Sequence, residues 1–235
     1  MIRKINNYNS SDTVAFIISD VAQISELNLG GKESEYLKKA LNKNGNAILN
    51  LYDKYLPVFL ADTKKCDDEN MEHLRKFGYE ISTQLNKAKC KSLVIADLSA
   101  KGLALTLAEG VELSNYRFDK YLSKKQDVSL TDIAVCGDVD DVEIERLNSL
   151  VYGVYAARDI VNEPLSYMTA KKLAEEIEKI GKNCGFKTEI LDKMQIESLK
   201  MGGILAVNRG SVEPPTFSLL KWEPENAINQ KPYVL

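Results

Sequence analysis

The hydrophobic positions of the first 137 residues follow two different periods. Continuous apolar runs, rich in β-branched and aromatic residues, predict buried strands at residues 13–19, 47–52, 56–61, 92–96 and 132–136. The polar pair Asp53-Lys54 separates two of these runs and predicts a hairpin. Apolar residues spaced by three and four predict helices at residues 35–41, 67–85 and 103–113. Because strands and helices alternate, this part of the chain is expected to form an α/β domain.

A longer helical pattern follows at residues 142–161. It ends at Pro164, whose ring does not fit a helix interior. This helix is predicted to connect two domains. Its expected inward face consists of Leu147, Leu150, Val151, Val154 and Ala157.

The remaining residues predict a second α/β domain. Thr169 is a suitable N-cap for a helix that ends before Gly185. A strand is expected at residues 187–191 and a helix at residues 194–200. Three further strands, at residues 204–207, 216–222 and 231–235, are expected to share one sheet, whose open edge predicts self-association. The expected domains are residues 1–140, a connecting helix over 141–165, and residues 166–235.

Composition narrows the classes of function. The chain has 235 residues, of which 44% are hydrophobic and 28% charged, and its formal net charge is −3. This balance lacks the basic excess of most nucleic-acid binders, so nucleic acid is not an expected partner. The longest apolar run, residues 56–61, is far shorter than the roughly 20 residues of a membrane-spanning helix. Arg3 and Lys4 precede polar residues rather than the apolar core of a secretory signal, so a cytoplasmic location is expected.

Few residues suggest chemistry by themselves. His73 is the only histidine, and its place in a polar-faced helix favours an exposed side chain over a catalytic one. The acidic residues 138–145 could coordinate a hard cation, but helix capping explains them better. The segment M-G-G-I-L-A-V-N-R-G-S fits turns around a strand better than a phosphate-binding loop. The cysteines lack metal-site spacing and are expected to be reduced core thiols: Cys66, Cys90, Cys136 and Cys184.

Two blocks, N-Y-R-F-D-K-Y at residues 115–121 and A-R-D-I-V-N-E-P at residues 157–164, resemble signatures of the leucyl aminopeptidase family. Their order and separation also fit that family. The helix from Ala170, the strand K-T-E-I-L-D, the M-G-G segment, a Pro-Pro pair and K-P-Y-V-L extend the resemblance over nearly the whole chain. Two departures are local: Leu165-Ser166 replaces a usual Pro-Asn, and Ala170 replaces a frequent proline.

The resemblance implies a macro-domain-like α/β domain joined by a long helix to an incomplete α/β peptidase domain. It implies a cytosolic, hexameric metallopeptidase that uses two zinc or manganese ions to remove amino-terminal residues from peptides. In the family the metal ligands lie in Gly-Lys-Gly, Thr-Phe-Asp-Ser-Gly-Gly and Asn-Thr-Asp-Ala-Glu-Gly-Arg segments, which do not occur here. The chain is therefore expected to be a fragment without catalytic, metal-binding or cofactor-binding residues, and inactive alone. The alternative is a non-catalytic, macro-like module for binding or oligomer assembly.

Overall fold

The computed structural model describes residues 1–62, 66–125, 127–229 and 231–234. The chain forms two compact units, Met1–Ala157 and Arg158–Leu235, and each is described by itself. No helix among the described residues is long and apolar enough to cross a membrane.

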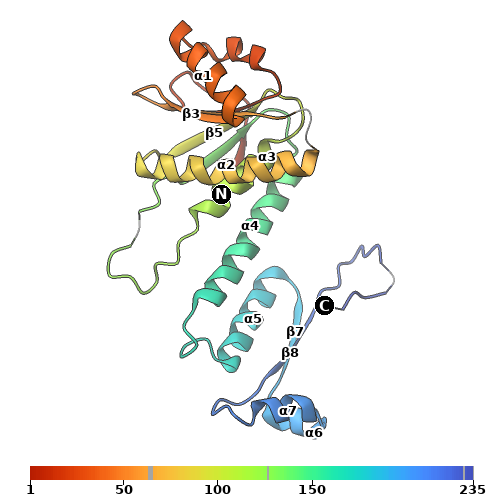
Figure 1. The fold of residues 1–235 in the computed structure, drawn as a ribbon. Helices are drawn as coiled ribbons and strands as arrows, with labels where there is room; N and C mark the ends of the chain where they lie inside the picture. The colour runs from red at the N-terminus through yellow and green to blue at the C-terminus, as the bar shows by residue number, and fades with distance from the viewer. Residues whose placement is uncertain (63–65, 126, 230, 235) are drawn as a thin grey trace. The chain divides into compact units, whose positions relative to one another are not determined.

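Unit 1 is built on a six-stranded sheet with the order β1-β6-β5-β2-β4-β3 (Figure 1). All neighbouring strands are parallel except β3 and β4, which form the predicted hairpin. The strands are β1 (Ile2–Ile5), β2 (Val14–Ile18), β3 (Asn46–Asn50), β4 (Tyr55–Leu60), β5 (Ser92–Asp97) and β6 (Asp132–Cys136). The helices are η1 (Val21–Leu27, 3₁₀), α1 (Gly31–Asn44), α2 (Asp67–Lys87), α3 (Ala104–Asn115) and α4 (Asp141–Asn162), whose last residues belong to unit 2.

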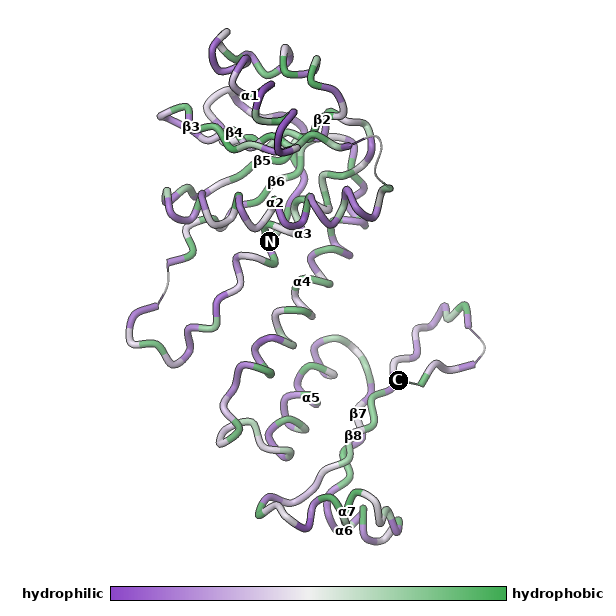
Figure 2. Tube along the Cα trace, viewed as in Figure 1, coloured by the Kyte–Doolittle hydropathy of each residue, from purple (hydrophilic) through white to green (hydrophobic). Residues whose placement is uncertain are grey.

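Helices cover both faces of this sheet, which explains why its central strands are apolar on both sides (Figure 2). On one face Ala15 and Ile17 of β2 pack in a core with α2 and α3. On the other face Phe16 and Ile18 pack in a second core with η1 and α1. The predicted inward residues of α2 are all at most 1% exposed: Leu74, Phe77, Ile81 and Leu85. The α/β prediction is confirmed for this unit.

Two elements of unit 1 were not predicted. β1 is a four-residue edge strand, I-R-K-I, too short and too polar to show a period. η1 begins with a capping box, in which the Asp20 carboxylate accepts from the Ala22 backbone N–H at 2.7 Å and the Gln23 side chain accepts from the Asp20 N–H at 3.1 Å. The D-x-x-Q spacing of Asp20 and Gln23 is therefore the sequence signal for this turn.

The amino-terminal part of α4 packs on unit 1. The Asn148 side chain accepts from the backbone N–H of Ile2 at 2.9 Å and donates to its carbonyl at 2.8 Å, as a neighbouring strand would. Ile144 and Val151 are buried. The predicted face is wrong at Leu150, which is 48% exposed, and at Ala157, also exposed, because the helix contacts β1 through the Ile144–Asn148–Val151 side instead.

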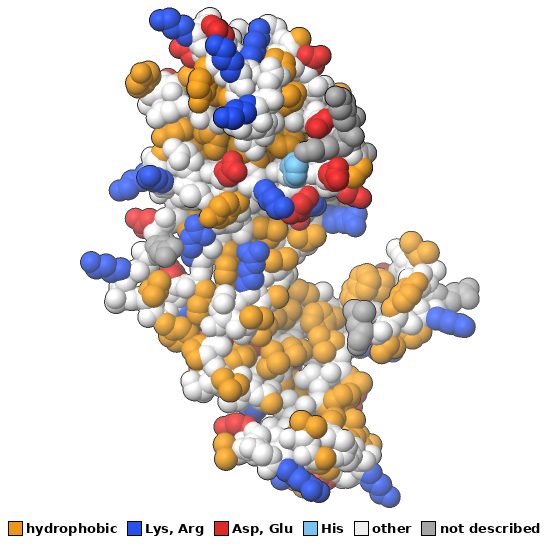
Figure 3. Space-filling view, in the orientation of Figure 1, with side chains coloured by type: hydrophobic (Ala, Val, Ile, Leu, Met, Phe, Trp, Pro, Cys, Tyr) orange, Lys and Arg blue, Asp and Glu red, His pale blue; other side chains and the backbone are white. Residues whose placement is uncertain are grey.

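Unit 2 contains α5 (Ala170–Cys184), β7 (Lys187–Leu191), α6 (Lys193–Ser198), α7 (Gly202–Asn208) and β8 (Phe217–Lys221). β7 and β8 form an antiparallel two-stranded sheet. The Thr169 hydroxyl accepts from the Lys172 N–H, and Gly185 ends α5 at φ 78°, as predicted. Apolar side chains are spread over the visible surface of this unit (Figure 3).

The predictions of strands at residues 204–207 and 231–235 are wrong for the residues that the structure describes. Residues 202–208 form α7, in which the half-buried residues Ile204, Leu205 and Asn208 recur at helical spacing. A four-residue apolar run does not distinguish strand from helix, and no neighbouring strand pairs with it. Residues 231–234 have no strand pairing, Pro232 lacks an N–H donor, and Leu235 lies outside the described residues.

Candidate functional site

A hollow of unit 1 lies where the chain leaves the carboxyl ends of β2 and β4. The chain leaves β2 through η1 and α1 on one face of the sheet, and leaves β4 through α2 on the opposite face. Ligands of open α/β sheets bind at such a switch point, because the two departing connections leave a crevice between them. A pocket of about 740 Å³ lies there, lined by the residues after β2 and β4, the end of α1 and one side of α2.

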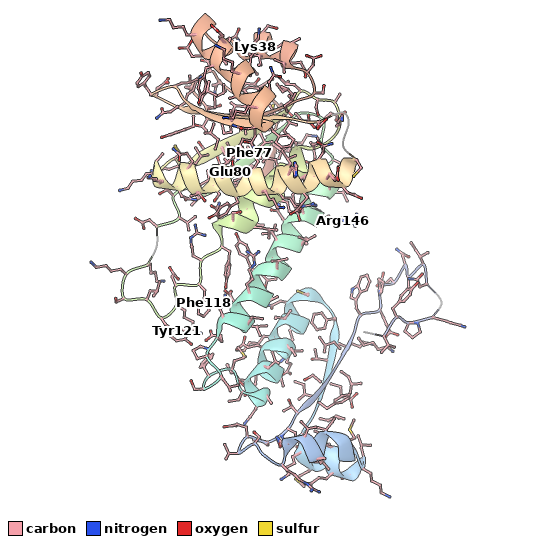
Figure 4. All side chains as sticks on the ribbon, in the orientation of Figure 1. Lys38, Phe77, Glu80, Phe118, Tyr121 and Arg146 are labelled. Carbon is pink, nitrogen blue, oxygen red and sulfur yellow. The ribbon has the colours of Figure 1, made fainter. Side chains whose placement is uncertain are left out.

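The lining of this switch-point pocket combines opposite charges and amides over an apolar base. Carboxylates come from Asp20, Asp62 and Glu80, and ammonium groups from Lys43 and Lys76. Phe77 lies at its base and Glu80 one turn further along α2 (Figure 4). The arrangement suits a polar ligand of mixed charge. The pocket volume is within the few hundred to 1,000 Å³ typical of small-molecule sites.

Hydrogen bonds hold the loops that form this pocket. The Asn70 side chain, 2% exposed, accepts from the Asp62 N–H at 3.0 Å and donates to the Asp62 carbonyl at 2.9 Å. The Gln23 amide donates to the Leu98 carbonyl at 2.7 Å and its oxygen accepts from the Ser19 N–H at 2.8 Å. The Ser19 hydroxyl also donates to Gln23, so it is not positioned as a nucleophile.

His73 lines this pocket from α2. Its side chain is exposed, as the helix pattern predicted. The other pocket residues were not predicted. The sequence does contain a signal for this pocket, because Asp20 and Asp62 each follow a buried strand. Polar residues at the carboxyl ends of adjacent parallel strands lie close together in the folded sheet.

The acidic residues before α4 cap the helix. The Asp140 carboxylate accepts from the Val142 N–H at 3.0 Å, as the capping interpretation predicted. Among the described residues there is no group of three histidine, cysteine or carboxylate side chains that could hold a metal ion. The donor set of this part of the chain therefore does not fit a two-metal centre, which requires several carboxylates around both ions.

The block at residues 115–121 has a structural role. The Asn115 oxygen accepts from the Ser82 hydroxyl at 2.8 Å and from the Asn86 amide at 2.9 Å, while its amide donates to the Leu130 carbonyl at 3.0 Å. The next residue, Tyr116, packs edge-on against the ring of Tyr155 in α4, with 5.2 Å between ring centroids.

The loop continues with a second aromatic pair, Phe118 and Tyr121, with 5.9 Å between ring centroids (Figure 4). The Arg117 guanidinium donates to the carbonyls of Ser114 and Tyr116 at 2.8 and 2.7 Å, and so closes the end of α3. The Tyr155 hydroxyl donates to the Glu112 carbonyl. This block therefore joins the end of α3 to α4 within unit 1.

The block at residues 157–164 ends α4. The last helical residue is Asn162, and the Pro164 carbonyl accepts from the N–H groups of Tyr167 and Met168, both at 2.9 Å. This turn leads directly to Thr169, the N-cap of α5. The block thus forms the start of the connection between α4 and α5.

The cysteines are all free thiols, but only two are shielded from solvent. Partial burial raises the pKa of the Cys90 and Cys136 thiols. Cys66 and Cys184 are exposed, so the prediction of core thiols is wrong for these two. They lie at a helix boundary and at a helix end, where one side remains open to solvent.

Two family models match the chain in sequence order. Residues 63–125 match the N-terminal domain of the cytosol aminopeptidase family, and residues 155–235 match the catalytic domain of the same family. The block at residues 115–121 lies within the first match, and the block at residues 157–164 lies within the second.

Curated relatives carry the same description, probable cytosol aminopeptidase. The Persephonella marina protein is 35% identical over 74% of this chain and 37% of its own length. The Aquifex aeolicus protein is 29% identical over 89% of this chain and 42% of its own length. The Chlorobaculum parvum protein is 37% identical over 58% of this chain and 28% of its own length. The chain thus spans less than half the length of these relatives.

Solved structures share the fold. A mutant of tomato leucine aminopeptidase superposes with a TM-score of 0.76 at 20% identity, over 93% of this chain and 50% of that one. The bottromycin maturation enzyme BotP in complex with Mn superposes with a TM-score of 0.69 at 18% identity, over 92% and 46%. The two matches come from one family and occur in the order of its domains, and the shared fold agrees with them. The chain belongs to the cytosol aminopeptidase family.

Proposed function

We propose that this chain is the amino-terminal portion of a metal-dependent aminopeptidase that removes amino-terminal residues from peptides. The observation that carries this proposal is the order of the two matches, with the N-terminal-domain match before the catalytic-domain match on one chain. The curated relatives named as cytosol aminopeptidases support the same activity and a cytoplasmic location.

The finer parts of this proposal concern metals, organisation and assembly. The metals are zinc or manganese, and a neighbour solved with Mn supports a divalent ion. Because the described residues offer no metal-binding cluster, the ligands are assigned to the part of the relatives that this chain does not span. The proposed organisation is a macro-like α/β domain over residues 1–140, a connecting helix over 141–165 and the start of the peptidase domain over 166–235. The proposed assembly is a homo-oligomer, a hexamer as the resemblance implies.

The activity is tested with a covalent fusion. The chain is joined to the part of the Persephonella marina relative that follows the segment matched here, and hydrolysis of a leucine anilide is measured with Mn²⁺ or Zn²⁺ and after chelation. The chain alone is expected to be inactive, because a two-metal mechanism needs carboxylate ligands for both ions. The fusion is expected to show metal-dependent hydrolysis. A folded fusion without activity, beside an active intact relative, would contradict the proposal.

The second candidate is a non-catalytic binding or assembly module. The observation that favours it is the switch-point pocket, which is formed entirely by unit 1 and has the size of a small-molecule site. A nucleotide-binding version lacks support from the sequence, which has no phosphate-binding loop. Isothermal titration of the chain with amino acids and nucleotides, compared with a variant carrying Asn70→Ala, separates a ligand-binding module from a purely structural domain.

A further inference from the structure

Two charged side chains that line the switch-point pocket have no partner among the described residues. Lys43 at the end of α1 and Glu80 on α2 are exposed and face solvent at the pocket. Neither side chain forms an ion pair or a hydrogen bond in the part of the chain that the structure describes, whereas Lys76, which also lines the pocket, pairs with Glu72 at 3.4 Å. Lys43 and Glu80 can therefore pair with a bound molecule, and removing either charge breaks no contact of the fold.

The helix ends around this pocket favour a cationic group over an anionic one. α1 presents its carbonyl end, where Gly45 ends the helix at φ 75° and its N–H donates to the Leu41 carbonyl at 2.8 Å. The last carbonyls of a helix carry partial negative charge, which attracts cations. The start of η1 is capped by Asp20, and the first turn of α2 contains Asp68 and Glu69. A phosphate group is therefore disfavoured at both helix starts, and an ammonium group is favoured at the end of α1.

The base of the pocket is apolar. Phe59 and Phe77 line it, and their ring centroids lie 6.0 Å apart. Leu41, which belongs to the core on the other face of the sheet, lines it as well. An apolar base below a few charged groups is the usual composition of a small-molecule site, in which the charges orient the ligand. A ligand for this pocket therefore needs an apolar group as well as charge.

The carboxylates of the lining outnumber its ammonium groups by three to two. We propose that the switch-point pocket binds a zwitterion with an apolar side chain, of the free amino acid or short-peptide class. The ammonium group of the ligand pairs with Glu80 and the other carboxylates, its carboxylate pairs with Lys43, and its side chain lies on Phe59 and Phe77. This inference names the ligand of the binding module that is the second candidate function. It rests on that candidate and is independent of the peptidase activity.

The ligand class is tested with three probes that share one side chain and contain no peptide bond. Leucine has both charged groups, isopentylamine lacks the carboxylate, and isocaproate lacks the ammonium group. Binding to the full chain is measured by titration followed by heteronuclear NMR. Leucine is expected to have the lowest Kd, with a Kd about threefold higher for isopentylamine and about tenfold higher for isocaproate, because the lining favours the ammonium group. The amides of Gly45, Asn46, Asp62 and Phe77 are expected to shift, while those of β6 do not.

Glu80→Gln and Lys43→Gln test the two assigned charges. Glu80→Gln is expected to raise the Kd of leucine and isopentylamine about threefold without raising that of isocaproate. Lys43→Gln is expected to raise the Kd of leucine and isocaproate about threefold without raising that of isopentylamine. The matched control is Lys38→Gln, since Lys38 is exposed on α1 and lies away from Phe77 and Glu80 (Figure 4), and it should leave each Kd unchanged.

The same titration with leucyl-glycine shows whether the peptide or the free amino acid is the better ligand of this shared chemistry. Equal Kd values for leucine, isopentylamine and isocaproate would overturn the inference, as would amide shifts outside the pocket or variants that behave like Lys38→Gln. Binding of AMP in place of leucine would overturn the ligand class and keep the second candidate function. Binding of no probe would overturn both. Neither result bears on the metal-dependent hydrolysis by the fusion, which tests the peptidase proposal separately.

Discussion

Asn115 connects three segments of unit 1 through one side chain. It accepts from Ser82 and Asn86 and donates to the Leu130 carbonyl, and it is only 9% exposed. Asn86 in turn accepts from the Leu130 N–H at 3.0 Å. A family motif residue can therefore act by fixing a loop on two helices rather than by contacting substrate.

Asn115→Ala is expected to lower the free energy of unfolding by about 3 kcal/mol, because it leaves two donors and a carbonyl without their partner in a buried site. The measurement is urea denaturation followed by circular dichroism. The control is Asn42→Ala on the exposed side of α1, which should change the stability by less than about 0.5 kcal/mol. Equal effects of the two changes would show that the Asn115 network contributes no stability.

A pH-dependent contribution is expected from Asp132. Arg3 donates to both of its carboxylate oxygens, each at 2.8 Å, and these hydrogen bonds hold the pKa of Asp132 below its usual value. The pair joins β1 to β6, but both side chains are about half exposed to solvent, so its contribution is expected to be about 0.5 kcal/mol.

This contribution is present above the unfolded-state pKa of Asp132 and is lost as pH falls through the lower folded-state pKa. Asp132→Asn is therefore expected to be less stable than the parent chain at neutral pH and equally stable in acid. Thermal unfolding of both proteins from pH 7 to pH 2 checks this. A stability difference that does not change with pH would rule out the Arg3 pair as its source.

At the scale of elements, the crossing of α2 and α3 depends on two glycines. A Cβ on Gly78 would lie 2.7 Å from the carbonyl carbon of Gly110 and from the N of Val111, and a Cβ on Gly110 would lie 2.5 Å from the Arg75 carbonyl oxygen. All of these atoms are backbone, which cannot move aside as a flexible side chain can. Close helix packing here therefore requires the absence of a side chain.

Gly78→Ala is expected to lower the free energy of unfolding by about 2 to 3 kcal/mol, because overpacking forces the two helices apart. Gly153 in α4 is the matched control, since a Cβ there meets nothing within 4 Å. Gly153→Ala should instead raise stability by about 0.5 to 1 kcal/mol through helix propensity. Denaturant titration measures both, and a stabilising Gly78→Ala would contradict the packing argument.

At the scale of the whole molecule, the two units differ in how complete they are. Unit 1 contains both hydrophobic cores and the six-stranded sheet, and α4 covers part of it through Ile144, Asn148 and Val151. A polypeptide of residues 1–157 is therefore expected to fold cooperatively on its own.

The free energy of unfolding of a polypeptide of residues 1–140 is expected to be about 3 kcal/mol lower than that of a polypeptide of residues 1–157. It lacks the two buried side chains of α4, each worth about 1.5 to 3 kcal/mol, and the bonds of Asn148 to β1. Thermal and urea unfolding of both polypeptides checks this. Equal stability would place the domain limit at residue 140, as the hydropathy pattern predicts.

The amino-acid sequence alone determined the element types where apolar residues formed a continuous strand-length run or recurred at helical spacing over several turns. The five strands predicted for unit 1 all occur, because a sheet covered by helices on both faces needs continuous apolar strands. The helices with inward residues such as Leu74 and Phe77 also occur, because apolar residues spaced by three and four lie on one side of a helix. The resemblance carried by residues 115–121 and 157–164 was sufficient to identify the family, which the comparisons then confirmed.

Tertiary structure decided what local pattern leaves open. Residues 204–207 are apolar enough for either element, and helical packing rather than their composition makes them part of α7. Which side of α4 is buried depends on where β1 lies, since only the folded sheet places Ile2 beside Asn148. The switch-point pocket likewise exists only because β2 and β4 become neighbours, which brings Asp20 and Asp62 together from positions 42 residues apart. Local sequence sets the preferences of each segment, but contacts between distant segments supply the free energy that chooses among them.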